Sequence, residues 1–563
     1  MKGLPVSPSK VMTLPEAVER FVRPGMFLHL AYNGGRPNAA VAEVARRFAG
    51  TSPGFRVSAH GFVNTQHVLV AAGLVSRLTV AYAGENFPSP RPNPVLQRAS
   101  RDGSVRIDNW SIWTLTARLM AGALGVPFLP VRSLEGSTMA AEHAGSAYHE
   151  VGPDGAVTPV VTALRPDVVL LQGLAADPAG NVILAPPYGE GAWGSLAARD
   201  GVIACVEKLV DEDFIRRHSS RPMIPAHAVR AVCHVPFGSH PYGLWPVGLD
   251  EVAGHTEDVE FMAGLRAAAE DPEELARWTK TWVTGVRDHA GFLDRLGPDR
   301  LRSLRSPVAA VPVPSPAEPT AEERMTLAAA RVVGERVTAA GHDVALAGIG
   351  FAHLAAWVAV ARLRASGSPV QLAAELGMSG FEPLPGDPYL FAGQNLPTCL
   401  QLTDVLTVLG RDIAGPGTSA LGVLGAGQID GAGNINSTVG ADGGFLVGSG
   451  GANDVASAAD DVVAVVKHSP RRLVETVPYV TVPGRRVSAI VTSEAVLERR
   501  NGRYEIATYV AGPGEDRDAA VRRIIARTGF AVGVRPDCRA EPPPDPAGLD
   551  RLRGYDPQRV FLG

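Results

Sequence analysis

One acidic side chain and one glycine-rich stretch carry the residue types best suited to chemistry in this chain. Glu375 ends a short apolar run in the segment QLAAELGMSGFEPLP, residues 371–385, and two glycines follow it closely. Glycine lets the main chain approach a ligand, so an acid in this setting leaves room for a bulky reactant. The glycine-rich stretch spans residues 421–468 and contains GSGGAND at 448–454. Successive N–H groups in such a turn can bind an anion or a developing oxyanion. These two segments are the ones from which a function can be predicted.

Length and composition are those of an ordinary globular protein. The chain has 563 residues, of which 45% are hydrophobic and 20% charged. Because a single core stops growing at about 250–300 residues, at least two domains are expected. The net charge of −4 gives no basis for nucleic acid or an anionic membrane as partner.

Cysteine usage and hydropathy point to the cytoplasm. The four cysteines fit no zinc spacing and suit a reducing compartment. No signal peptide is visible at the N-terminus, and no segment reaches about 20 uninterrupted apolar residues. We therefore expect a cytoplasmic protein without a membrane span.

Short β-branched runs alternate with helix signals along the first part of the chain. A strand, a glycine turn and a helix are predicted at residues 27–31, 33–35 and 39–48, as at the start of a βα unit. Further strands are predicted at residues 56–59, 78–82, 167–171 and 201–206. Strands that alternate with helices indicate an α/β fold with an open, mostly parallel sheet.

A proline-rich segment divides the chain in two. Residues 306–319 read SPVAAVPVPSPAEP, and this composition predicts an extended, semi-rigid linker. Thr320 and Glu323 then form a capping-box pattern that opens a new helix. The predicted domains are residues 1–305 and 320–563.

The second domain repeats the pattern of the first. Three pairs of segments match in the same order: residues 30–46 with 346–362 at a constant offset of 316, 177–181 with 430–434, and 200–206 with 460–466. The matches predict two similar open α/β domains related by an internal repeat. They place His60 opposite Glu375, at equivalent strand ends. Asp430 and Asn434 are expected to shape a turn through side-chain to main-chain hydrogen bonds.

The motifs resemble those of family I coenzyme A transferases, in the glutaconate CoA-transferase branch. Residues 1–305 resemble the α chain of that family and residues 320–563 its β chain, as if both were fused. The β-like signatures are a Glu-x-Gly with a later Pro-x-Pro in 375–385, AGQIDGAGNIN at 426–436, and GSGGAND at 448–454. The α-like signatures are AGLVSRL at 72–78 and VPFLPVRSLEGS at 126–137.

This resemblance implies an enzyme that moves CoA from an acyl-CoA to a carboxylic acid. Glu375 would be the nucleophile that forms an acyl-glutamyl anhydride and then a glutamyl-CoA thioester. The resemblance implies a coenzyme A thioester as substrate, no permanently bound cofactor and no metal. It also implies a homodimer equivalent to an α2β2 assembly.

Further site residues are expected around this nucleophile. Oxyanion and CoA-binding groups are predicted in the main chain of Gly448, Gly450, Gly451 and Ala452, with Asn33, Gly34 and Gly35 across the interface as second choice. Four side chains are candidates for binding the substrate: His60, Arg36, Gln428 and Asn453. His60 has a structural histidine as its alternative role. An arginine would suit a second carboxylate on the substrate. The competing acids, Glu382 and Glu494, are expected on the surface.

Two other functions stay open. Leu376 follows Glu375 where the family commonly has a small or amide residue, and relatives of this branch hydrolyse or decarboxylate acyl-CoA. An acyl-CoA hydrolase or decarboxylase on the same fold is therefore the first alternative, and a non-catalytic metabolite-binding protein is the second. The retained glutamate favours transfer.

Overall fold

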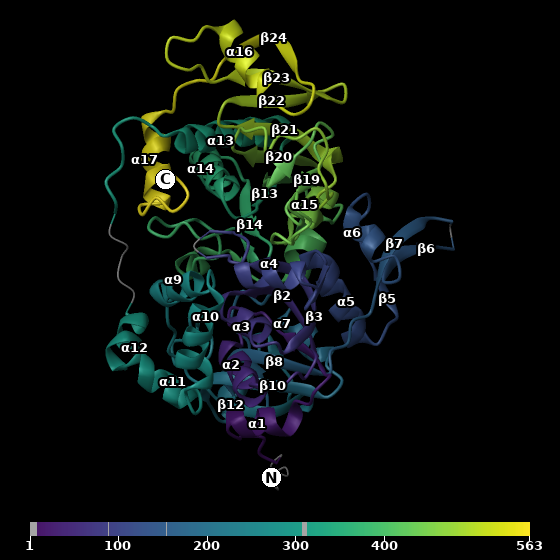
Figure 1. Cartoon of the computed structure of the whole chain (residues 1–563), viewed down its shortest axis with the longest axis vertical. Coiled ribbons are helices and arrows are strands. Elements are labelled where there is room, and N and C mark those ends of the chain that lie inside the picture. The colour runs from purple at the N-terminus through teal and green to yellow at the C-terminus, as the bar shows by residue number, and fades with distance from the viewer. Residues whose placement is uncertain (1–7, 88, 154, 307–311) are drawn as a thin grey trace.

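The computed structural model describes residues 8–87, 89–153, 155–306 and 312–563 (Figure 1). An N-terminal half, coloured purple to teal, lies below a C-terminal half, coloured teal-green to yellow. Of the predicted linker, residues 307–311 lie outside the described residues. Residues 312–319 form no helix or strand, and the Val313 amide donates to the Pro557 oxygen at 2.8 Å. Within the described ranges, none of the helices has the length and apolar character needed to cross a membrane.

A nine-stranded sheet forms the centre of the N-terminal half. Its order is β11-β9-β8-β1-β2-β3-β4, with β10 beside β8 and β12 beside β10, and all pairs except those of β9 are parallel. The strands are β1 (Phe27–Leu30), β2 (Phe55–Val63), β3 (Val75–Gly84), β4 (Arg106–Asn109), β8 (Val168–Ala176), β9 (Val182–Ile183), β10 (Gly201–Leu209), β11 (Met223–Ile224) and β12 (Val229–His234). All residues of β8 are buried, as expected for a parallel sheet with both faces covered. The predicted strands are confirmed, and several are longer than predicted.

Helices cover this sheet, and a small satellite sheet projects from it (Figure 1). The helices are α1 (Leu14–Phe21), α2 (Asn38–Arg47), α3 (Val68–Ala71), α4 (Pro94–Arg101), α5 (Ile112–Leu124), α6 (Thr138–Glu142), α7 (Gly191–Leu196), α8 (Glu212–Arg217), α9 (Val259–Ala268), α10 (Pro272–Thr279), α11 (His289–Leu296) and α12 (Pro298–Arg305). The satellite sheet contains β5 (Phe128–Pro130), β6 (Ala147–Val151) and β7 (Val157–Thr162).

A ten-stranded sheet forms the centre of the C-terminal half. Its order is β16-β15-β14-β13-β17-β20-β21-β22-β23-β24, and the run from β14 to β21 is parallel. The strands are β13 (Val344–Ala347), β14 (Gln371–Ala374), β15 (Met378–Ser379), β16 (Gln401–Leu402), β17 (Ala420–Gly425), β20 (Asp461–Val466), β21 (Val487–Thr492), β22 (Ala495–Arg500), β23 (Arg503–Tyr509) and β24 (Gly533–Ala540). A separate pair is β18 (Gln428–Ile429) with β19 (Ile435–Asn436).

The helices of this half begin and end where the sequence signals them. The predicted capping box of Thr320 and Glu323 opens α13 (Ala321–Ala340), and Gly341 ends it with a left-handed φ of +68°. The other helices are α14 (Phe351–Ala365), α15 (Ala452–Ala458), α16 (Arg517–Ala526) and α17 (Pro546–Tyr555).

The central strands of the two sheets follow the same path. Five parallel strands lie in the order β2-β1-β8-β10-β12 in one half and β14-β13-β17-β20-β21 in the other. The turn after β8 and the turn between β18 and β19 are also built alike. Asp177 accepts hydrogen bonds from the Gly180 and Asn181 amides, and Asp430 accepts them from the Ala432 and Asn434 amides. The two similar open α/β halves and the Asp430 turn are thus confirmed.

Strand register corrects the predicted alignment by one residue at β1. When the two aspartate turns are superposed, Val168 of β8 is equivalent to Leu421 of β17. Val168 pairs with Leu28, whereas Leu421 pairs with Ala345. β1 and β13 therefore align at an offset of 317 (345 minus 28), not 316. Register is set by pairing with neighbouring strands, and a slip of one residue would turn every side chain to the other face.

The corrected register retains the predicted equivalence of His60 and Glu375. Arg56 of β2 pairs with the first residue of β1, and Gln371 of β14 pairs with the first residue of β13. Arg56 and Gln371 are thus equivalent, and four residues further along each chain lie His60 and Glu375.

The two halves are joined by main-chain hydrogen bonds along β3. The Gly450 amide donates to the Ala81 oxygen at 2.8 Å, and the Ala83 amide donates to the Val447 oxygen at 2.9 Å. The N-terminal half thereby supports the glycine-rich turn of the C-terminal half, and this seam contains the candidate site.

Candidate active site

Glu375 lies directly after β14, where the strand ends in a turn that requires glycine. Gly377 has a φ of +119°, and a Cβ at this position would lie 2.0 Å from the Thr403 oxygen. The Thr403 amide in turn donates to the Gly377 oxygen at 2.7 Å. This turn keeps the Glu375 side chain inside the molecule, where it is 9% exposed. Among the described residues, its Oε2 atom has no hydrogen-bond partner.

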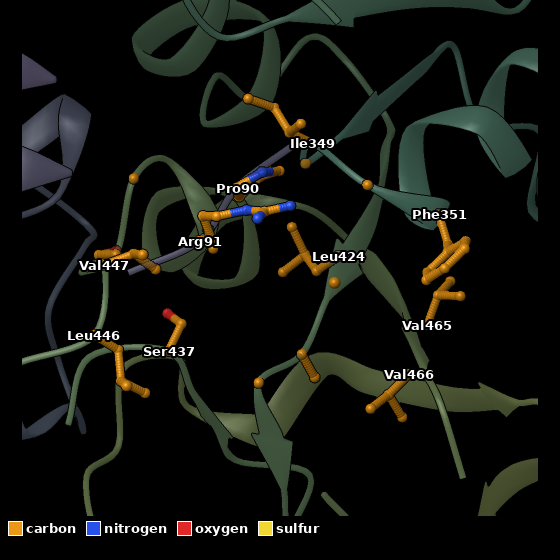
Figure 2. A pocket seen from close by; sticks show the side chains of 18 of the residues that line it. Pro90, Arg91, Ile349, Phe351, Leu424, Ser437, Leu446, Val447, Val465 and Val466 are labelled. Atoms are coloured by element: carbon orange, nitrogen blue, oxygen red, sulfur yellow. The ribbon is translucent and has the colours of Figure 1, made fainter. Parts of the chain in front are cut away.

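Glu375 is the one acidic residue that lines a pocket of about 920 Å³ within the described structure. Both halves contribute to the pocket, with Tyr82 and Arg91 from the N-terminal half and the 448–452 turn from the C-terminal half. Figure 2 shows Arg91 extending among apolar side chains that include Ile349 and Leu424. Pockets of about 300–1,000 Å³ commonly hold a small molecule or cofactor, so this one is large enough for a substantial ligand.

Gly451 packs directly against the Glu375 side chain. A Cβ at Gly451 would lie 3.4 Å from Cγ of Glu375 and 3.7 Å from its carboxyl carbon. The amides of Gly448, Gly450 and Ala452 already donate to the oxygens of Ser437, Ala81 and Ser449. All three residues line the pocket, and their predicted role in binding CoA stays a prediction, although their amides already have acceptors.

The Gly451 amide is the predicted donor that stays available. It makes no main-chain or side-chain hydrogen bond to any of the described residues. Gly451 therefore combines a free amide with contact to the Glu375 side chain.

The pKa of Glu375 is raised to about 7, mainly by burial; a main-chain hydrogen bond within Glu375 lowers it, and the nearby charge of Asp454 raises it. Asp454, itself buried, accepts hydrogen bonds from the Ser111 hydroxyl at 2.5 Å and the Trp113 amide at 2.9 Å. Its own pKa is raised to about 6 by burial. Buried acids whose pKa values are raised in this way are typical of functional sites. Sequence analysis missed Asp454, although it is the last residue of GSGGAND.

Asn33, Gly34 and Gly35 do not line the Glu375 pocket. Asn33 is fully buried and donates to the Gln172 oxygen at 2.9 Å. The Gly34 amide donates to the Ala185 oxygen, and the Gly35 amide points to Asn33 Oδ1 at 3.4 Å. Their polar groups are therefore used within the N-terminal half, and the prediction that they stabilise an oxyanion is corrected.

Arg36 is buried between two aromatic rings. Its guanidinium carbon lies 4.8 Å from the ring centroid of Tyr32 and 4.7 Å from that of Tyr242. One guanidinium nitrogen donates to the Gly61 oxygen at 3.1 Å. Among the described residues it pairs with no carboxylate. A cavity of about 40 Å³ lies beside it, lined also by Glu257.

Of the three remaining substrate-binding candidates, one lines the pocket and two do not. Gln428 lines the pocket. Asn453 is fully buried and joins the halves, because its Oδ1 accepts from the Leu134 amide at 2.8 Å. His60 is buried in a polar cluster with Glu190. Asn453 and His60 therefore do not line the pocket.

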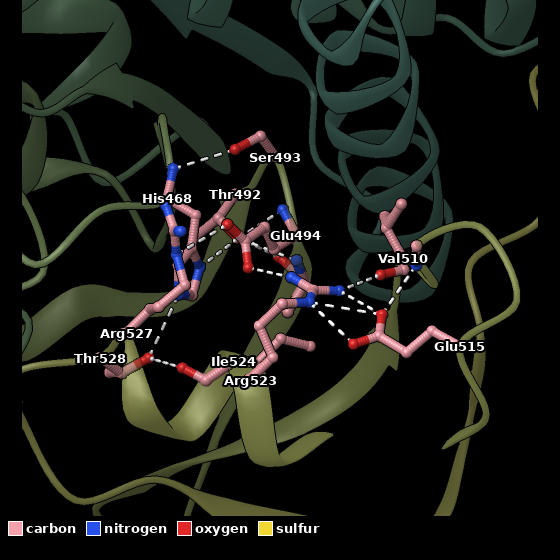
Figure 3. A network of polar contacts seen from close by, with 12 residues as sticks. His468, Thr492, Ser493, Glu494, Val510, Glu515, Arg523, Ile524, Arg527 and Thr528 are labelled. Carbon is pink, nitrogen blue, oxygen red and sulfur yellow. Dashed lines mark hydrogen bonds and ion pairs between the residues drawn. The ribbon is translucent and has the colours of Figure 1, made fainter. Parts of the chain in front are cut away.

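Neither competing acid lies at the pocket. Glu382 is exposed and pairs with Arg364 at 3.1 Å, as predicted for a surface residue. Glu494 is not a surface residue: its side chain is 16% exposed and is held between Arg523 and Arg527 (Figure 3). The structural reason is that Arg523 of α16 and Arg527, which follows that helix, both pair with Glu494.

Exposed cations lie along the pocket, and sequence analysis missed them. Arg91, Lys467, Arg471 and Arg472 all line it. Lys467 pairs with Glu322, whereas the three arginines form no ion pair with any described residue. An anionic ligand would therefore meet a basic rim and a buried carboxylate in one pocket.

Known proteins match this chain in both halves. Residues 11–234 match the family model described as Coenzyme A transferase. The chain is 29% identical over 294 residues to one of the two subunits of a 3-oxoadipate CoA-transferase from Pseudomonas knackmussii, covering 50% of this chain and 97% of that subunit. It is 27% identical over 328 residues to the corresponding subunit of the glutaconate CoA-transferase from Acidaminococcus fermentans. This match covers 53% of this chain and 95% of that subunit. Residues 11–234 thus belong to the coenzyme A transferase family.

This transferase also matches the second type of subunit. The other subunit of the Pseudomonas knackmussii enzyme is 29% identical over 155 residues, which cover 24% of this chain and 58% of that subunit. One coenzyme A transferase chain thus matches both subunits, as a fusion requires. Over 95% of its length it shares its fold with an acyl-CoA transferase from Escherichia coli O157:H7, at a TM-score of 0.66 and 14% identity, and the match covers 95% of that chain.

Proposed function

We propose that this coenzyme A transferase moves CoA from an acyl-CoA to a carboxylic acid through a covalent glutamyl-CoA thioester on Glu375. The observation that carries the proposal is a buried carboxylate, free of a partner at Oε2 among the described residues, in a pocket of about 920 Å³ beside the free Gly451 amide. A carboxylate with few hydrogen bonds is a stronger nucleophile than a solvated one.

The first step is attack of a Glu375 oxygen on the thioester carbonyl. A carbon–oxygen bond forms, the carbon–sulfur bond breaks, and the products are an acyl-glutamyl anhydride and CoA thiolate. The Gly451 amide would donate to the oxyanion that develops in this step. The thiolate then attacks the glutamyl carbonyl, which releases the first carboxylate and leaves glutamyl-CoA on the enzyme.

The acceptor acid reverses these steps. Its carboxylate attacks the glutamyl thioester to form a new anhydride and CoA thiolate. The thiolate then attacks the acceptor's carbonyl, so the new acyl-CoA leaves and the Glu375 carboxylate is regenerated. One thioester replaces another, and burial of Glu375 keeps water from hydrolysing the intermediates.

The basic rim suits the phosphate groups of CoA. Arg91, Arg471 and Arg472 offer guanidinium groups that lack carboxylate partners among the described residues. Arginine binds phosphate through two parallel hydrogen bonds. The thioester end of CoA would then reach inward to Glu375.

We expect the acyl group to extend toward Arg36, which lines a separate cavity of about 40 Å³. Tyr32 lines the Arg36 cavity, and its pKa is raised to about 12, mainly by burial. The charge of Arg36 lowers this pKa, whereas the charges of Glu190 and Glu375 raise it. Tyr32 therefore lies within electrostatic range of both Arg36 and Glu375. The unpaired Arg36 would bind a second carboxylate on the acyl chain. 3-Oxoadipate and glutaconate, for which two relatives are named, each carry two carboxylates.

Hydrolysis and decarboxylation of acyl-CoA are not favoured. Both would need a group that activates water or withdraws electrons from the acyl chain, whereas the described residues that line the pocket include a single acid and no histidine. Transfer needs only a nucleophilic carboxylate and a donor for the oxyanion.

The decisive test is to trap the intermediate. Protein incubated with acyl-CoA alone and then reduced with borohydride should carry a mass change that maps to Glu375. Hydroxylamine should inactivate the enzyme only when acyl-CoA is present. Release of free CoA without an acceptor acid, with no adduct at Glu375, would instead support hydrolysis.

The proposal extends to assembly and location. The chain is expected to form a homodimer in the cytoplasm, equivalent to two pairs of subunits, with halves at residues 1–305 and 320–563. Light scattering on the purified chain tests the dimer, and a mass of one chain would contradict it.

A further inference from the structure

A buried ion pair in the N-terminal half lies beside the proposed site without lining the pocket. Glu190 is 0% exposed and His60 is 2% exposed. His60 Nδ1 pairs with Glu190 Oε2. The other carboxylate oxygen accepts from the Tyr32 amide at 2.8 Å and lies 3.3 Å from His29 Nε2. Burial opposes ionisation of Glu190, but His60 and His29 outweigh it and lower its pKa to about 2. Glu190 is therefore a carboxylate.

The contacts of His60 link Glu190 to the main chain of Ile112. Its Nε2 lies 3.1 Å from the Ile112 oxygen and 3.0 Å from the Thr116 hydroxyl, which itself donates to the same carbonyl at 2.8 Å. Nε2 must therefore donate to Ile112, while Nδ1 faces the Glu190 carboxylate. His60 thus bridges the Glu190 carboxylate and the Ile112 oxygen.

Each partner of this pair is linked to one wall of the proposed site. Gly189, next to Glu190, donates from its amide to the Leu376 oxygen at 3.1 Å. Ile112, which His60 binds, donates from its amide to the Gly450 oxygen at 3.0 Å. The contacted residues are the direct neighbours of Glu375 and Gly451. One ion pair thus spans the nucleophile and its hydrogen-bond donor.

The same linkage reaches the second buried acid. Ser111 and Trp113 flank Ile112, and both donate to the Asp454 carboxylate. The position of Ile112 therefore affects Asp454 as well as Gly450.

We propose that the His60–Glu190 pair is a positioning clamp, which fixes the distance between Glu375 and the Gly451 amide from the opposite half. This inference rests on the proposed function of Glu375. The two residues act through main chain and do not touch substrate. Without the pair, the segments that carry Glu375 and Gly451 could move relative to each other. A displacement of about 1 Å at a reacting group lowers the rate about 100-fold.

The clamp is tested by charge-neutral variants of the full chain. His60→Gln, Glu190→Gln and the double variant are compared for kcat, KM for acyl-CoA, the single-turnover rate of adduct formation at Glu375, and Tm. Each single change should lower kcat and the adduct rate about 10- to 100-fold with KM within about twofold. The fold-loss of kcat in the double variant should be smaller than the product of the two single fold-losses, because the partners act as one unit.

The double variant also guards against a failure to fold, since removing both charges is milder than leaving one buried without its partner. Glu43→Gln is the matched control, because Glu43 is buried and pairs with Arg46 at 2.8 Å in the same half, away from the pocket. It should lower Tm and leave the kcat of folded protein unchanged. A double variant with kcat within about twofold of wild type would overturn the clamp, as would an equal loss in Glu43→Gln. Absence of any adduct in the wild type would instead refute the proposed function.

Discussion

His60 and Glu375 occupy the same register position in two copies of one fold, yet only Glu375 reaches the pocket. Both residues come four positions after the first register-matched residue of the second strand in each half. In the N-terminal half this position holds a histidine buried against Glu190. In the C-terminal half it holds a carboxylate whose Oε2 has no partner among the described residues. One copy of the repeat therefore serves to support the other.

Changing Glu375 should abolish transfer. Glu375→Ala removes the nucleophile, and Glu375→Asp should lower kcat by about 100-fold because the carboxylate is withdrawn by about one bond length. Steady-state transfer assays and adduct mapping measure both effects. Glu382→Gln is the matched control, since Glu382 is an exposed acid that follows Glu375 closely in the sequence. Full activity in Glu375→Ala would refute the mechanism.

The rate should fall on the acid side of about pH 7. The attacking group must be ionised, and burial raises the pKa of Glu375 to about 7. We expect kcat/KM to drop about tenfold per pH unit below that value. Asp454→Asn removes a neighbouring charge that also raises this pKa, so its profile should shift toward lower pH. An unchanged profile in Asp454→Asn would argue against coupling of the two acids.

Glu375→Gln should stabilise the fold, and more so at higher pH. The folded-state pKa lies above the ordinary value of 4.5, so the folded protein holds the proton longer than the unfolded chain. Wild-type stability is therefore highest below about pH 4.5 and is lost as pH rises toward 7. The glutamine side chain of the variant does not ionise, so the variant does not lose this stability as the pH rises. Its Tm should exceed that of the wild type by about 2–4 °C at pH 8 and by less at pH 5. Equal differences at both pH values would contradict the raised pKa.

Gly451→Ala should slow the chemical step. The new methyl group would lie 3.4 Å from Cγ of Glu375, at the tight limit of van der Waals contact, and would restrict how the carboxylate can move during attack. We expect about a tenfold loss of kcat. Gly417→Ala is the control, because a Cβ there meets nothing within 4 Å. Comparable losses in both variants would mean that Gly451 has no special role.

Neutralising the rim should weaken binding of CoA and spare the chemistry. Arg91→Gln and Arg471→Gln are each expected to raise KM for acyl-CoA by about tenfold, which corresponds to about 1.4 kcal/mol. Acyl-pantetheine lacks the phosphate groups, so its kinetics should not respond. Arg500→Gln, an exposed arginine outside the pocket, serves as control. If KM for acyl-pantetheine rises equally, the rim does not bind phosphate.

Sequence patterns predicted the features that depend on neighbours along the chain. Glu375 with its glycine turn, the Gly451 segment and the Asp430 turn are all local motifs, so residue type and spacing sufficed. Glu190 was missed because its partner His60 lies 130 residues away (190 minus 60). The prediction for Gly34 was wrong because its amide is taken by Ala185, far later in the chain. Glu494 was misplaced because Arg523, from a later helix, covers it.

Hydrogen bonds between β3 and residues 447–450 make one strand of the first half a structural wall for the second. An enzyme built from two separate polypeptides would have to meet its partner before that wall could form, and dilution would pull it apart. With both pieces on one chain the encounter is intramolecular, so its strength is set by tether length and not by protein concentration. Specific activity should accordingly stay constant down to low enzyme concentrations unless dimerisation adds a further requirement.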